Sequence, residues 1–264
     1  MTSAVRRSLG ELTFGEVSQH LRQTSIVCLP LGAIEQHGPH LPLNTDMIIA
    51  EEFAGRIVAR WGETFDLWQL PSIAVGLSRE HDWAPGTLSL SIENFVALLR
   101  NLAGEIVRAL PARNLVIVNG HGGNRGVLDN VMYELSGDFG LNSCVIHPFD
   151  LAVTDTQPDA LDVHGGKSET SVMLVLAPDL VRRAMIQPAA EPPDLEKAAA
   201  LIFDRGASFP WRSDDARLAA NGVIGEAQQA TPELGRAIID RVVERSRTVL
   251  ERLLDNQCAL TRRG

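Results

Sequence analysis

Short apolar runs alternate along the chain with longer segments whose apolar positions recur at helical spacing. The short runs span 26–31, 67–73, 114–119 and 143–147, and the helical pattern covers 46–60, 92–110, 124–135, 168–176 and 231–254. Short, nearly continuous apolar runs are typical of strands buried on both faces. Because such strands alternate with helices, the pattern predicts an α/β fold with a parallel sheet covered on both sides.

One later stretch, 183–232, breaks this pattern. It is rich in Pro, Ala and Asp and has no regular apolar periodicity. We interpret it as an irregular excursion within a single domain covering 1–264, because 264 residues suffice for one large α/β domain.

The composition limits which binding partners and which cellular compartment we expect for this protein. The net charge of -9 gives a surface that repels phosphate backbones, so we expect no nucleic-acid partner. No apolar run approaches the roughly 18 residues that span a bilayer, and no secretory signal opens the chain. The cysteine count is odd, and Cys28 and Cys144 lie in strand-like runs. We therefore expect a cytoplasmic protein with reduced thiols and no membrane partner.

Polar clusters follow the predicted strands. Glu35 and His37 come soon after the first strand, and Asn-Gly-His-Gly-Gly-Asn at 119–124 follows the third. A further cluster at 163–170, Val-His-Gly-Gly-Lys-Ser-Glu-Thr, opens a predicted helix. Ligands of open parallel sheets bind beyond the carboxyl ends of the strands. Three loops that are distant in sequence are therefore predicted to meet in one crevice.

The residue types in these loops favour a metal site. Glu35 and His37 are two apart in an extended segment, so both point to one side. Asp46 lies at a helix start, where the backbone dipole favours a carboxylate. His121 lies between glycines, which let the chain turn beside an ion. Histidines with carboxylates suit Zn²⁺, Mn²⁺ or Fe²⁺ better than Ca²⁺.

Each of these polar residues also has an ordinary structural explanation that involves no metal. Any one histidine could be a satisfied loop residue, and Asp46 could simply cap its helix. Gly122-Gly123 could cradle a phosphate, although the common nucleotide-binding patterns are absent. The segment 167–169 could be plain helix-start chemistry. The coincidence of several histidines and carboxylates at strand ends favours the metal interpretation.

Five motifs together resemble the creatininase family of metal-dependent amidohydrolases. They run in order over nearly the whole chain: LPLGAIEQHGPHLPLNTD (29–46), PGTLSL (85–90), VNGHGGN (118–124), HGGKSETS (164–171) and NGVIGEAQQATPELG (221–235). The resemblance implies a three-layer α/β/α sandwich with a mostly parallel central sheet. It also implies two divalent ions, Zn²⁺ with Mn²⁺ or Fe²⁺ as alternatives, and a homo-oligomer that is frequently a hexamer.

The resemblance also implies roles for particular residues. Glu35 and His121 would hold one ion, His37 would hold the other, and Asp46 would bridge both. His164 would match the histidine that handles protons during turnover.

The chain departs from creatininase itself at several positions. Gly122 and Gly123 replace a Tyr-Glu pair whose Glu is a metal ligand, so Glu169 is the candidate to replace that ligand or to act as general base. Two tryptophans that close the creatininase pocket fall near Phe149 and Ala160 here. Both departures weaken creatinine as the substrate.

The GHGGN form is similar to other branches of the family, a formamide hydrolase and the peptidase of mycofactocin maturation. The segment 76–81 also resembles those branches. This segment and the glycine motif are predicted to contact the substrate, through Ser78, Glu80, His81, Gly122, Gly123 and Asn124. The segment 76–81 could equally be a structural loop.

These features lead to one function hypothesis with alternatives. A metal-bound hydroxide would attack a non-peptide or cyclic amide of a small polar molecule, and His164 would protonate the departing nitrogen. The alternatives are a peptidase of the mycofactocin-maturation type, a metal-dependent lyase or isomerase, and a protein that keeps the fold without catalysis.

Overall fold

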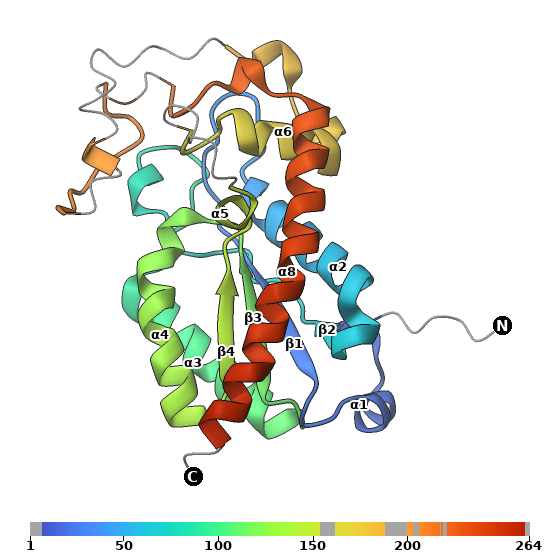
Figure 1. Ribbon diagram of the computed structural model, residues 1–264. Coiled ribbons are helices and arrows are strands. Elements are labelled where there is room, and N and C mark those ends of the chain that lie inside the picture. The colour runs from blue at the N-terminus through green and yellow to red at the C-terminus, as the bar shows by residue number, and fades with distance from the viewer. Residues whose placement is uncertain are drawn as a thin grey trace.

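The fold is built on a sheet of four parallel strands. The computed structural model describes residues 7–153, 162–187, 200–202, 206–216, 218 and 221–261. In the sheet, the strand order is β2-β1-β3-β4. All three pairings are parallel, so the carboxyl ends of the strands lie at one edge (Figure 1). The strand bounds are β1 Ile26–Leu31, β2 Leu67–Gln69, β3 Asn114–Asn119 and β4 Asn142–Ile146.

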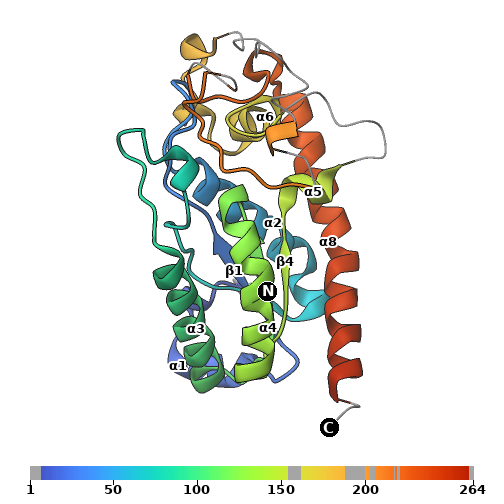
Figure 2. The ribbon, with the colours of Figure 1, turned by 90° about the vertical axis from the view of Figure 1, so that its left-hand side faces the viewer.

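Helices cover both faces of this sheet. Their bounds are α1 Phe14–His20, α2 Thr45–Phe65, α3 Ile92–Ala109, α4 Arg125–Phe139, α5 Pro148–Ala152, α6 Lys167–Leu176 and α8 Pro232–Thr261. In the view of Figure 2, α3 and α4 lie on one side of the strands and the long helix α8 lies on the other. The three-layer α/β arrangement that the sequence predicts is therefore confirmed.

Alternate residues of the strands belong to two separate apolar cores, one on each face of the sheet. Cys28 and Val116 belong to the core that packs against α2, α6 and α8. Val27 and Leu115, one position earlier on the same strands, belong to the core that packs against α3 and α4. Successive side chains of a strand point to opposite faces, so a strand between two helical layers must be apolar at every position.

The second strand is shorter than predicted. Its apolar pattern runs to Ile73, but β2 ends at Gln69 and only an isolated bridge joins Leu31 to Ile73. Pro71 interrupts the pairing, because proline has no N–H to donate to the ladder. The short helices α1 and α5 were not predicted, whereas the bounds of the other helices lie close to their predicted ranges.

The described parts of the irregular excursion contain short turns rather than a layer of their own. Leu218, Ile224 and Trp211 form a small apolar cluster with Val163. Backbone hydrogen bonds join Ile224 to His164 in both directions, at 3.0 and 2.8 Å. The segment thereby fixes the loop that precedes α6. The single-domain interpretation stays a prediction, and the predicted position at Ala160 lies outside the described residues.

None of the described helices combines the length and the apolar character that a membrane-spanning segment needs.

Candidate metal centre

The strand-end loops converge at the carboxyl edge of the sheet. Glu35 and His37 follow β1, and His121 follows β3. Asp46 is the second residue of α2, His164 lies in the loop just before α6, and Glu169 lies in the first turn of α6. Glu35, His37, Asp46 and His121 are each at most 4% exposed.

Two glycines let the strand ends approach α2 closely. A Cβ at Gly32 would lie 2.5 Å from the backbone nitrogen of Met47. A Cβ at Gly120 would overlap the carbonyl oxygen of Asp46. Any side chain at these positions would push the start of α2 away from the sheet, so the glycines set the place of Asp46.

Asp46 contacts both halves of the cluster. Its Oδ1 lies 3.0 Å from His37 Nε2, and its Oδ2 lies 3.1 Å from His121 Nδ1. Glu35 Oε1 lies 3.2 Å from the same His121 nitrogen. The Asp46 side chain thus faces two histidines and does not cap its own helix, which was the ordinary alternative.

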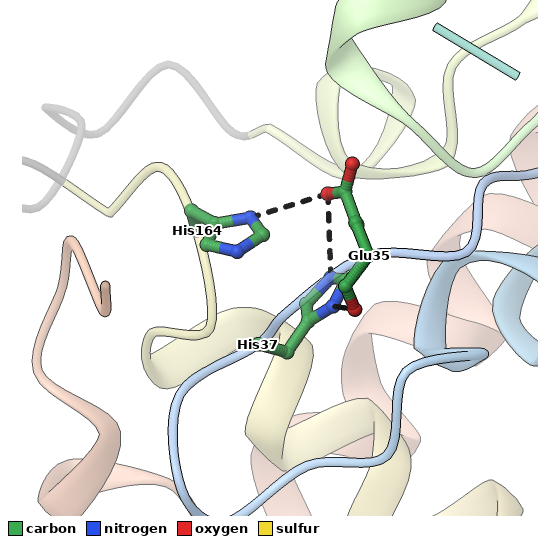
Figure 3. Close-up of side chains that lie close together, drawn as sticks. All are labelled: Glu35, His37 and His164. Atoms are coloured by element: carbon green, nitrogen blue, oxygen red, sulfur yellow. Dashed lines mark hydrogen bonds and ion pairs between the residues drawn. The ribbon is translucent and has the colours of Figure 1, made fainter. Parts of the chain in front are cut away.

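These side chains form overlapping groups of metal-ligand type. Glu35, Asp46 and His121 form one group, and His37, Asp46 and Glu169 form another, with the donor atoms of each group within 4.8 Å of one another. Glu35, His37 and His164 form a third group, drawn in Figure 3. The first two groups share Asp46, so the geometry offers two neighbouring cation positions with one carboxylate between them.

The hydrogen bonding of the carboxylates fits a cation. Both carboxylate oxygens of Glu35 and Oδ2 of Asp46 are buried, and no hydrogen bond from the described residues reaches them. A buried carboxylate oxygen without a donor is costly unless a cation compensates it. Nitrogen and oxygen donors at such a site suit Zn²⁺, Mn²⁺ or Fe²⁺.

The pKa values indicate the same demand for positive charge. Burial raises the pKa of Glu35 to about 7, against the opposing effect of His121. Burial alone would lower the pKa of His37, but the Asp46 charge and hydrogen bond outweigh it and raise this pKa to about 10. The carboxylates therefore hold positive charge beside them even where burial opposes it.

Glu169 lies where the sequence placed the replacement ligand. Its Oε2 accepts a hydrogen bond of 2.6 Å from the backbone N–H of Gly165 and lies 3.8 Å from His37 Nε2. Burial raises its pKa to about 7. Its carboxylate is 14% exposed, more than Glu35 or Asp46. Both predicted roles, ligand and general base, are compatible with this position.

A cavity of about 550 Å³ opens beside the cluster. Its lining contains seven residues that the sequence had singled out, namely Glu80, His81, His121, Gly122, Gly123, His164 and Glu169. The wall also includes Arg79, Val163, Phe209, Pro210, Trp211 and Arg212. The predicted meeting of distant loops thus produces a pocket of the size that holds drug-sized ligands.

Two predicted substrate contacts lie outside this lining. Asn124 is fully buried, and its side chain accepts from the Leu77 N–H while donating to the Gly32 carbonyl and to Asn119. Those bonds use the amide to join three loops, and the contact of Asn124 with substrate stays a prediction. Ser78 is also fully buried and outside the lining, and its contact with substrate likewise stays a prediction.

Sequence reasoning missed two polar residues that hold the wall in place. The Nε2 of Gln36 lies 3.0 Å from His164 Nε2 and 3.1 Å from His81 Nδ1. Ser213, fully buried, lies 2.7 Å from His81 Nδ1. Gln36 could have been noticed between two candidate ligands in Glu-Gln-His. Ser213 lies in the irregular excursion, where no pattern marks it.

Comparisons with known proteins point to one family. The creatininase family profile, described as creatinine amidohydrolase, matches residues 10–250. A mycofactocin precursor peptide peptidase of Mycobacterium tuberculosis (strain CDC 1551 / Oshkosh) is 34% identical over 245 residues, which cover 89% of this chain and 88% of the relative. A creatinine amidohydrolase of Pseudomonas putida is 29% identical over 261 residues, with coverage of 89% and 93%. A solved manganese creatininase superposes with a TM-score of 0.73 at 27% identity, covering 96% of this chain and 99% of that one.

Proposed function

Because the chain belongs to the creatininase family of hydrolases, as its motifs predict, we propose that it is a metal-dependent hydrolase that cleaves an amide C–N bond of a peptide substrate. The observation that carries the proposal is the pair of donor groups that share Asp46. The buried carboxylate oxygens of Glu35 and Oδ2 of Asp46, which accept no hydrogen bond from the described residues, add a physical need for cations at that place.

The proposed hydrolase would use two divalent ions as cofactors, Zn²⁺ or alternatively Mn²⁺ or Fe²⁺. Glu35, Asp46 and His121 would hold one ion, and His37, Asp46 and Glu169 the other. When bound, such ions activate a water molecule as nucleophile and polarise the amide carbonyl. The chain's own groups then have to orient the substrate and move the protons.

His164 is suited to move a proton in both directions. Its Nε2 lies 2.6 Å from the backbone carbonyl of Gln36, which can only accept, so Nε2 carries the proton. Nδ1 is then an unprotonated nitrogen, 3.6 Å from Glu35 Oε1. Burial and the neighbouring His81 hold the pKa of His164 well below its usual range. A neutral His164 first accepts a proton from the attacking water and then delivers it to the departing nitrogen.

A peptide substrate is favoured over a small ring by the similarity and by the cavity. The peptidase relative is more similar over the same share of the chain than the creatinine amidohydrolase is. The cavity of about 550 Å³ also carries apolar surface from Phe209 and Trp211 on one wall. Phe149, near a position where creatininase has a pocket tryptophan, packs on the apolar core instead.

A small cyclic amide is the second candidate, because the fold and the donor groups resemble creatininase throughout. A homo-oligomer and a cytoplasmic location stay predictions.

Hydrolysis in ¹⁸O-labelled water tests the proposal. The protein is stripped with a chelator, checked by elemental analysis and reloaded with Zn²⁺ or Mn²⁺. It is then offered a panel of short peptides, with free and blocked ends, and a panel of lactams, formamides and creatinine. We expect metal-dependent cleavage of peptides and one ¹⁸O in each new carboxylate.

The controls separate the alternatives. Cleavage of cyclic amides alone would favour the second candidate, and product without label would point to a lyase or isomerase. Activity in a preparation verified as metal-free would contradict the proposal altogether.

A further inference from the structure

His81 lies on the cavity wall beside His164, and the proposed proton transfers do not use it. It ends the 3₁₀ turn Arg79–His81 and is 1% exposed. Its ring stacks on His164 with centroids 3.9 Å apart. Its Nε2 lies 3.5 Å from Glu35 Oε1, so this nitrogen faces the candidate metal centre, whereas Nδ1 contacts Ser213 and Gln36.

The side chain of Gln36 presents only N–H groups to His81. Its Oε1 accepts a hydrogen bond of 2.8 Å from the backbone N–H of Gly38. Its Nε2 donates to the backbone carbonyl of Gly222 at 3.0 Å. These two backbone partners fix which end of the amide is which. The Gln36 atom 3.1 Å from His81 Nδ1 is therefore a donor.

The hydroxyl of Ser213 donates to His81. The indole N–H of Trp83 donates to its oxygen at 2.9 Å, and the Gln36 amide nitrogen lies 3.2 Å from it. With donors on its lone pairs, the single hydroxyl proton goes to an acceptor. His81 Nδ1 at 2.7 Å is closer than the Glu80 carbonyl at 3.4 Å. The Ser213 hydroxyl thus donates to Nδ1. The other described neighbour of Nδ1, the Gln36 amide nitrogen, cannot accept a proton from it, so the ring proton is on Nε2.

The ring is neutral as well as oriented. Because Nδ1 accepts the hydrogen bond of the Ser213 hydroxyl, it carries no proton, and the ring has one proton and no net charge. A neutral imidazole with a fixed N–H can donate a hydrogen bond without giving up its proton. Triosephosphate isomerase uses a neutral histidine in this way to polarise a carbonyl.

We propose that His81 is held as a neutral Nε2–H donor that binds the oxygen of the scissile carbonyl, and that Ser213 is the positioning residue that holds it so. The inference rests on the proposed hydrolysis. As the carbonyl is attacked, its oxygen gains negative charge, and a preorganised donor stabilises that charge more than the neutral ground state.

In this arrangement, the irregular excursion positions Ser213 beside His81. The backbone N–H of Ser213 donates to the Glu80 carbonyl at 3.0 Å, and Arg212 pairs with Asp82 at 2.9 Å. These contacts attach the segment around Ser213 to the turn that carries His81. A change at Ser213 should therefore act through the His81 ring and leave the metal ligands in place.

Nitrogen NMR of the zinc-loaded protein tests the tautomer without any substrate. The protein is labelled with ¹⁵N-histidine, and the His81 signals are identified by their loss in His81→Gln. We expect a protonated Nε2 and an unprotonated Nδ1 in the unchanged protein, and a mixture of tautomers in Ser213→Ala. Ser246→Ala, which removes a buried hydroxyl bonded to Val243 in α8, is the matched control. A protonated Nδ1 in the unchanged protein, or an unaltered tautomer in Ser213→Ala, would overturn the inference.

Variants of His81 test the donor role at equal metal content. With a peptide that is hydrolysed, His81→Leu should lower kcat by about 10²–10³ with little change in KM. His81→Gln, which keeps an N–H, should recover part of that loss. If no amide proves to be a substrate, binding of inorganic phosphate to the zinc-loaded protein serves instead, because it presents tetrahedral oxyanions. Phosphate should then bind about tenfold more weakly to His81→Leu, and equal kcat or equal phosphate affinity would overturn the donor role.

Discussion

Asp46 is the residue on which both halves of the candidate metal centre depend. Its two oxygens face different histidines, at 3.0 and 3.1 Å. Asp46→Asn keeps the shape but removes the negative charge, so both ions should be lost together. The loss of affinity should exceed the roughly 10–100-fold that changes in outer partners cost. Elemental analysis of the purified variant measures this, and Asp150→Asn, an exposed partner of Arg125, is the control. Retention of one ion would contradict a bridging role.

His164 should matter for rate and much less for metal content. The two donor groups that share Asp46 do not include it. His164→Asn is expected to keep both ions while kcat falls by roughly 10²–10⁴, the usual contribution of a general acid or base. Turnover and metal stoichiometry are measured on the same preparation, with His20→Asn as a control outside the site. If metal is lost in His164→Asn, this histidine is a ligand through its group with Glu35 and His37.

At the residue scale, the sequence indicated the candidate metal ligands better than it indicated the residues that hold other side chains in position. Glu35, His37 and His121 follow strands in the sequence, and Asp46 opens a helix. Parallel topology brings the strand ends together wherever helices intervene. Ser78 and Asn124 lie outside the cavity lining, because a motif shows which residues are near one another along the chain and does not show where their side chains point. Ser213 carries no local pattern, since its role arises from a tertiary contact with a turn far away in the chain.

At the element scale, the start of α2 depends on the absence of side chains at the strand ends. A Cβ at Gly120 would overlap the Asp46 carbonyl, whereas a Cβ at Gly126, in α4, would meet nothing within 4 Å. Gly120→Ala should therefore destabilise the fold by about 1–3 kcal/mol through overpacking. It should also weaken metal binding by displacing Asp46. Gly126→Ala should instead stabilise it by about 0.5–1 kcal/mol. Urea unfolding of both variants measures the difference, and equal effects would contradict the close approach.

The carboxyl end of α2 carries a pH-sensitive contact at Asp66. Burial would raise the pKa of Asp66, but hydrogen bonds from Ser25, Arg7 and Trp68 outweigh it and lower this pKa. A lowered folded-state pKa stabilises the fold above the unfolded value of about 3.9, and this contribution is lost as pH falls through the lowered value. Asp66→Asn should cost about 1–2 kcal/mol at neutral pH.

The difference between the unchanged protein and Asp66→Asn should shrink as the solution is acidified. Urea unfolding at stepwise lower pH measures it, with the exposed Glu105→Gln as control. A difference that stays constant with pH would show that the Asp66 charge contributes nothing.

Helices and strands were predictable where apolar periodicity was long, as in α3 and β3. The missed helix α1 does carry a local signal, because Thr13 and Glu16 form a capping box in the structure and the Thr-x-x-Glu spacing is visible in the sequence. The five-residue helix α5 is too short for periodicity to reveal. The early end of β2 follows from a single residue, Pro71, whose missing N–H a purely apolar pattern does not register.

At the scale of the whole molecule, the layer order was predictable because β-α alternation permits few topologies. The cavity was not predictable, since its wall combines the turn 79–81 with the excursion residues 209–212. Those two segments are joined by contacts such as that of Arg212 with Asp82, which no spacing in the sequence encodes.

The candidate metal centre joins β1, β3, α2 and α6, so its occupancy should set the stability of the molecule. An ion that binds only the folded state adds about 2.7 kcal/mol when its free concentration is one hundred times Kd. For a domain of this size, that corresponds to a rise in Tm of about 5–10 °C. Thermal unfolding of the chelated protein, followed by titration with Zn²⁺ or Mn²⁺, measures the effect. The Tm of Asp46→Asn should not respond to the same titration. If both proteins respond alike, the stabilising ion binds elsewhere, and if neither responds, the buried carboxylates are compensated without a metal.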